Sequence, residues 1–171
     1  FWAIRGGSGN FGVVSRFEFR LHPVGPEVLS GMVVYPLKEA AHALKQFRDH
    51  VKKLGEDTNV WTVMRKAPPL PFLPPEVHGT EIIAFCFFHA GNPEEGRTAV
   101  EPLRHFGTML GDFAVMQPYT AWQQTFDPLL TPGARNYWKS HNFADLSDGA
   151  IDVAVKYVQS CLLYTSPSPR D

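Results

Sequence analysis

The sequence predicts an α+β fold in which helices pack on one face of an antiparallel sheet. Segments with strict alternation or continuous apolar runs, both typical of strands, are interleaved with segments whose apolar residues recur every three or four positions, as in helices. The first two predicted strands, 13–22 and 28–36, are joined by a short turn, which leaves no room for a parallel crossover. The sheet is therefore expected to be antiparallel.

The remaining elements follow in chain order. In VVSRFEFRLHP, apolar residues at 13, 17, 19 and 21 alternate with polar ones, which predicts the half-buried strand 13–22. Segment 80–90 is nearly all apolar and predicts a central strand covered on both faces. Asn92 and Ser147 are expected to cap helix N-termini, and Pro102 to kink a helix. The other predicted elements are helix 37–54, strand 58–67, the proline-dense loop 67–77, helix 91–107, strand 112–119, helix 121–130, a turn and strand within 131–146, and helix 146–158.

Composition excludes several classes of partner. The 171 residues are 44% hydrophobic and 19% charged, as in ordinary globular proteins, and a net charge of −1 favours neither nucleic acid nor an anionic membrane. No apolar run reaches the roughly 18 residues of a membrane span. Cys86 and Cys161 define no disulfide framework, and no His or Cys spacing indicates a metal site. The sequence starts at Phe1, which suggests an internal piece of a longer protein and leaves localisation and oligomeric state open.

The stretch GSGNFG at 7–12 matches the dinucleotide fingerprint G-x-G-x-x-G. That fingerprint requires a helix directly after the glycines, because the helix N-terminus binds the pyrophosphate. Here an alternating strand pattern follows, so a nicotinamide-type site is not expected, and no Lys-Ser/Thr follows to make a P-loop. The glycines either let the backbone lie against a flat ligand or form a bulge leading into a strand, and the spacing alone leaves both open.

Two longer stretches add a family resemblance. FWAIRGGSGNFGVVSRFEFRLHPV resembles the end of the flavin domain of berberine-bridge-enzyme-like oxidoreductases, within the vanillyl-alcohol oxidase / p-cresol methylhydroxylase (PCMH) class, with Ser8 replacing a glycine and Ser15 a threonine. TPGARNYWKSHNFADLSD resembles the family's strand beneath the flavin ring. The resemblance implies FAD as the cofactor, and its attachment residues in the family lie upstream of the matched region.

Site residues follow from the same resemblance. The implied cofactor contacts are made by Gly7, Gly9, Asn10, Gly12, Val13 and Val14. The implied catalytic residues are Tyr137, which would orient or deprotonate a substrate hydroxyl, and Lys139, whose charge would stabilise the reduced flavin. This pair would have to lie near Asn10. The alternative interpretation is a surface strand with solvated charges.

The resemblance implies a division of the chain. Residues 1–24 would end an FAD-binding domain, and 25–159 would form a truncated substrate-binding domain. Residues 160–171 have a non-native composition, and LLYTSPSPRD resembles translated sequencing-adapter sequence. The implied activity is hydride transfer from a C–H bond of a small molecule (an alcohol, sugar or amine) to flavin, with oxygen as acceptor. The isolated chain is expected to bind FAD weakly or not at all. Alternatives are a non-catalytic α+β ligand-binding or interaction module, and a nicotinamide dehydrogenase if a helix follows Gly12.

Overall fold

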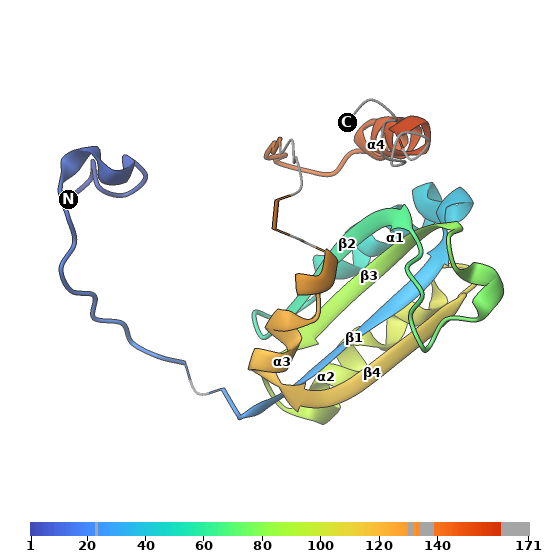
Figure 1. Ribbon diagram of the computed structural model, residues 1–171, viewed down its shortest axis with the longest axis horizontal. Helices are drawn as coiled ribbons and strands as arrows, with labels where there is room; N and C mark the ends of the chain where they lie inside the picture. Colours follow the sequence, from blue (N-terminus) through green and yellow to red (C-terminus); the bar gives the residue numbers. More distant parts are fainter. Residues whose placement is uncertain (23, 130–131, 134–138, 162–171) are drawn as a thin grey trace.

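The computed structural model describes residues 1–22, 24–129, 132–133 and 139–161, and it contains a four-stranded antiparallel sheet (Figure 1). The strands are β1 (Glu27–Pro36), β2 (Thr58–Lys66), β3 (Glu81–His89) and β4 (Gly111–Pro118), in the order β2-β3-β1-β4. The predicted α+β class and the antiparallel sheet are both confirmed.

The two most apolar strands, β1 and β3, occupy the centre of the sheet. Their register places Met32 opposite Cys86, and β4 on the other side of β1 places Phe113 opposite Met32. Nearly every residue of β1 and β3 is buried, which confirms the prediction for 80–90. A strand covered on both faces has no need of polar alternation, so its sequence is a continuous apolar run.

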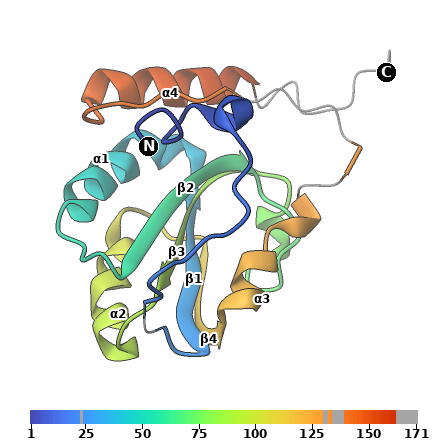
Figure 2. The ribbon, with the colours of Figure 1, turned by 90° about the vertical axis from the view of Figure 1, so that its left-hand side faces the viewer.

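Helices cover both faces of this sheet (Figure 2). Helices α1 (Ala40–Val51) and α2 (Pro93–Val100) lie on one face, and α4 (Asp148–Cys161) packs beside α1 (Figure 2). All three helices contribute to one apolar cluster. The short helix α3 (Tyr119–Gln124) lies on the other, where Trp122 joins a second apolar cluster with the proline-rich loop. The prediction of helices on one face is therefore wrong for α3, because β1 and β3 are apolar on both faces and each face needs a cover.

Helix ends follow the predicted capping chemistry. The Asn92 side chain accepts a hydrogen bond from the Glu94 N–H at 2.9 Å, and the Ser147 hydroxyl accepts one from the Ala150 N–H at 3.2 Å, which confirms both caps. Near Pro102, α2 gives way to a 3₁₀ helix (Glu101–His105), since proline has no N–H for the α-helical ladder. Two further 3₁₀ turns, Leu37–Glu39 before α1 and Asp127–Leu129 after α3, fill parts of the predicted helices 37–54 and 121–130.

The prediction of a strand at 13–22 is wrong. This stretch has no strand or helix assignment and runs away from the sheet as an elongated segment (Figure 1). Its apolar residues are exposed, with Val13 at 96% and Leu21 at 84% of full accessibility, and the one ring of the described residues that stacks on Phe17 is that of Phe19. A strand requires a hydrogen-bonded neighbour, and none of the described segments pairs with this one.

The predicted strand within 131–146 is not formed in its described part, since residues 139–146 have no strand. Positions 130–131 and 134–138 lie outside the described residues, as do 162–171. Helix α4 begins at Asp148 and continues to Cys161, three residues beyond its predicted end. No helix in the described part of the chain is long and apolar enough to cross a membrane.

Candidate functional site

The glycine-rich loop forms an exposed turn around a 3₁₀ helix (Ser8–Phe11). Gly6 and Gly12 have φ values of 114° and 138°, which only glycine adopts without strain. A side chain added at Gly6, Gly9 or Gly12 would meet nothing within 4 Å, so this surface of the loop is open to an approaching group.

Gly7, in contrast, has a structural role within the same loop. A Cβ at this position would collide with the Ala3 carbonyl oxygen and the Phe11 ring, and the Gly7 N–H donates to that same carbonyl at 3.0 Å. Gly7 is therefore required for closing the turn. Its predicted contact with the cofactor stays a prediction.

The loop fits one wall of a flavin site. Gly9, Asn10, Gly12, Val13 and Val14 are all exposed and uncharged, and a neutral amide with free backbone approach suits the carbonyl and ring-nitrogen acceptors of a flavin. Residues 13–22 form no helix, so the loop lacks the helix N-terminus that a nicotinamide dinucleotide needs. The nicotinamide dehydrogenase alternative required a helix directly after Gly12, so the structure does not support it.

The second predicted motif is only partly described. Tyr137 lies outside the described residues, and Lys139 is exposed. The catalytic roles of both residues, and their approach to Asn10, stay predictions.

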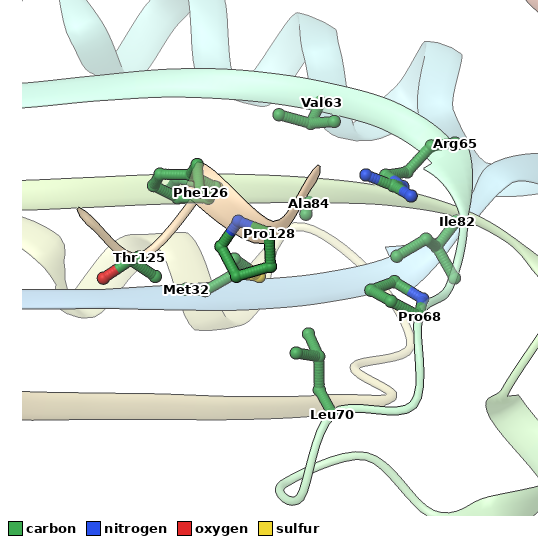
Figure 3. Close-up of a pocket in the computed structure, with 11 residues that line it drawn as sticks. Met32, Val63, Arg65, Pro68, Leu70, Ile82, Ala84, Thr125, Phe126 and Pro128 are labelled. Atoms are coloured by element: carbon green, nitrogen blue, oxygen red, sulfur yellow. The ribbon is translucent and has the colours of Figure 1, made fainter. Parts of the chain in front are cut away.

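An apolar pocket of about 160 Å³ lies on the α3 face of the sheet (Figure 3). Its floor comes from β1, β2 and β3, and its walls come from the proline-rich loop and the segment after α3. The floor residues are Met32, Val63, Ile82, Ala84 and Cys86, and the wall residues are Pro68, Leu70, Phe126 and Pro128. Sequence analysis did not find this pocket because its walls are brought together only by tertiary packing.

Two polar side chains line the pocket at opposite ends, Arg65 from β2 and Thr125 from the turn after α3 (Figure 3). The Thr125 hydroxyl donates to the Ala121 carbonyl at 3.1 Å, so it is left as an acceptor. Arg65 lies opposite Ile82 in the sheet register. One sequence signal could have indicated this arrangement. Trp61, Val63 and Arg65 alternate along β2 and therefore share one face of the strand, which places a cation at the end of that apolar face.

Cys86 is a buried thiol at the floor of this pocket. Burial raises the pKa of the Cys86 thiol to about 12, because desolvation disfavours the thiolate. The thiolate is the nucleophilic form, so Cys86 is an unreactive packing residue at neutral pH.

In a Cys161→Ser background, Cys86 is expected to resist a thiol-specific disulfide reagent at pH 8. The rise in pKa from 9.0 to about 12 lowers the thiolate fraction about 1,000-fold, and burial blocks access as well. The measurement is the labelling rate with and without denaturant. Labelling of the native protein as fast as the denatured one would show that Cys86 is accessible and ionised.

The chain is similar in sequence to several FAD-linked oxidoreductases. It is 31% identical over 136 residues to an FAD-linked oxidoreductase of Dictyostelium discoideum, covering 80% of this chain and 27% of the relative. It is 44% identical over 43 residues to the FAD-linked oxidoreductase aurO of Gibberella zeae, covering 25% of this chain and 8% of that protein. It is 23% identical over 121 residues to the (R)-6-hydroxynicotine oxidase of Paenarthrobacter nicotinovorans, covering 70% of this chain and 24% of that enzyme.

No protein-family model matches the chain. The matched segment spans 27% of the Dictyostelium relative and 24% of the Paenarthrobacter one, so the chain corresponds to about a quarter of their length. The chain is thus similar to a segment of FAD-linked oxidoreductases, and these similarities support FAD as the cofactor.

Proposed function

We propose that this chain is a segment of a longer FAD-dependent oxidoreductase of the berberine-bridge-enzyme-like, PCMH-type class. The enzyme would act on a small molecule with an oxidisable C–H bond next to oxygen or nitrogen (an alcohol, sugar or amine), with oxygen as the final acceptor. Bound FAD would supply the hydride acceptor. The observation that carries the proposal is the glycine-rich loop, whose open surface and positive φ angles permit close approach of a flat group.

In this proposal the loop binds and orients the flavin. Backbone at Gly9, Gly12, Val13 and Val14 would lie against the ring system, and the Asn10 amide would donate to or accept from its polar edge. Lys139 would hold a positive charge where negative charge develops after hydride transfer, and Tyr137 would orient a substrate hydroxyl.

The exposed segment 13–22 supports the proposed division of the chain. Its alternating apolar face and its backbone groups are presented to solvent, whereas residues 27–118 complete a sheet among themselves. We infer that 1–24 belongs with an FAD-binding domain whose sheet would pair with this segment. Residues 25–159 would then form the substrate-binding part, with 160–171 outside both.

The test is FAD binding by the full-length protein and its Gly12→Ala variant. Wild-type protein is expected to purify with bound flavin and to release hydrogen peroxide when it turns over substrate. Gly12→Ala is expected to lower FAD affinity about tenfold or more, since alanine at φ 138° costs about 1–3 kcal/mol or moves the loop. The measurement is the flavin-to-protein ratio together with equilibrium dialysis.

Gly79→Ala is the matched control. Gly79 also has a positive φ, 78°, and open space around it, but it lies in the loop before β3. Its replacement should also strain the backbone, while leaving flavin content unchanged. A wild-type protein without flavin would favour the non-catalytic binding module, and an unchanged flavin content in Gly12→Ala would remove the loop from the site. The 171-residue chain alone should bind FAD weakly, because it supplies only one wall.

A further inference from the structure

Arg65 carries a charge that no acidic residue of the described chain neutralises. Its Nε donates to the neighbouring Lys66 carbonyl at 3.1 Å, and none of the ion pairs among the described residues includes its guanidinium. The side chain is half-buried and turns from β2 toward the interior of the pocket (Figure 3). A half-buried guanidinium favours an anionic partner, such as a carboxylate, that accepts two parallel hydrogen bonds from its N–H groups.

Among the described residues, no acidic side chain forms an ion pair with Arg65. Asp127 directly precedes Pro128 of the pocket wall. Asp127 itself makes no ion pair with Arg65 in the described structure. The guanidinium of Arg65, with no acidic partner among the described residues, therefore favours a negatively charged ligand.

The size and lining of the pocket define the rest of that ligand. Its volume is about 160 Å³, and an apolar protein cavity of about 150 Å³ holds one benzene molecule. The lining between Arg65 and Thr125 is aliphatic, aromatic and proline carbon, together with the protonated Cys86 thiol. Such a lining suits one apolar ring between the two polar ends of the pocket.

We propose that the pocket binds the carboxylate of a single-ring aromatic or alicyclic acid, with the ring between Met32 and Phe126 and the carboxylate against Arg65. Bidentate pairing with the guanidinium sets the orientation, and burial of the ring supplies the apolar contribution. The inference assigns a ligand to this pocket and does not rest on the proposed function.

The test is binding of phenylacetate and of its neutral analogue phenylacetamide to the 171-residue chain, followed by NMR titration. Wild-type protein should bind phenylacetate more tightly, with intermolecular contacts from the probe ring to the Met32 and Leu70 methyl groups. Arg65→Gln should weaken phenylacetate binding about tenfold and leave phenylacetamide binding unchanged, because only the charged pair is lost. Lys66→Gln, the adjacent exposed cation on β2, should change neither.

Three outcomes would overturn the inference: no binding of phenylacetate by wild-type protein at millimolar concentration, equal binding by Arg65→Gln, or ring contacts to a different surface. None of these measurements involves flavin. Loss of probe binding with flavin binding intact in the full-length protein would refute the pocket assignment alone. A flavin-free full-length protein that still binds phenylacetate would refute the proposed function and leave the pocket in place.

Discussion

Replacement of Gly31 by alanine is expected to destabilise the protein by about 3 kcal/mol or more, a large share of the roughly 5–15 kcal/mol of a typical domain. Gly31 lies in the middle of β1, paired with Phe87 on one side and Ala114 on the other. A Cβ there would collide with the Phe113 carbonyl oxygen and would lie 2.5 Å from the Phe87 ring and 3.0 Å from the Ala114 Cα. Two of these three atoms are backbone, so relief requires separating β1 from β4.

The measurement is urea unfolding followed by circular dichroism, with Gly149→Ala as the matched control. Gly149 lies in the first turn of α4 with nothing within 4 Å of its missing Cβ, so alanine there should be neutral or stabilise by up to about 1 kcal/mol. Equal unfolding midpoints for Gly31→Ala and wild type would show that β1 and β4 do not approach as closely as the structure places them.

Phe85→Ala is expected to cost about 3–5 kcal/mol, the range for removing a large aromatic side chain from a packed core. Phe85 lies in β3 and is fully buried. Its ring makes edge or tilted contacts with Tyr35, Phe47 and Phe106 at centroid distances of 6.0, 5.4 and 5.4 Å. These three partners come from β1, α1 and the segment after α2, so the cavity would weaken three elements together.

Phe19→Ala is the control for this cavity, and the readout is again the free energy of unfolding. Phe19 is 73% exposed and, within the described part of the chain, stacks only on Phe17, so its removal should change stability by less than about 0.5 kcal/mol. A cost for Phe19→Ala close to that of Phe85→Ala would mean that segment 13–22 packs on the sheet. That result would contradict the exposed position described for this segment.

The sequence predicted best those elements whose signal is local. Strand 80–90 was recognisable because a central strand is apolar on both faces. Asn92 was recognisable as a cap because its side chain accepts a hydrogen bond from an N–H only two residues away. Segment 13–22 has an equally clear alternation and still forms no strand, since pairing depends on a neighbour that alternation cannot supply.

The two candidate sites differ in the same way. The glycine loop was recognisable from the sequence, because four glycines within seven residues indicate that the backbone can approach a ligand closely. The pocket around Arg65 was missed, since its floor comes from three strands and its walls from segments that are more than fifty residues apart in the sequence.

The sequence by itself determined the α+β class, the types of most elements between residues 28 and 158, two helix caps and the resemblance on which the flavin assignment depends. It also predicted an antiparallel sheet, but from a turn next to segment 13–22, which forms no strand. Each of these follows from residue periodicity, from capping chemistry or from a contiguous motif, and all three signals depend on residues close together in the sequence. Only the tertiary structure decided that α3 covers the second face of the sheet, that Gly7 closes its own turn, and that Arg65 lies at the end of an apolar pocket with no acidic partner among the described residues. These features depend on which segments, far apart in the sequence, pack against one another. The burial of apolar area on both faces of the sheet decides that packing.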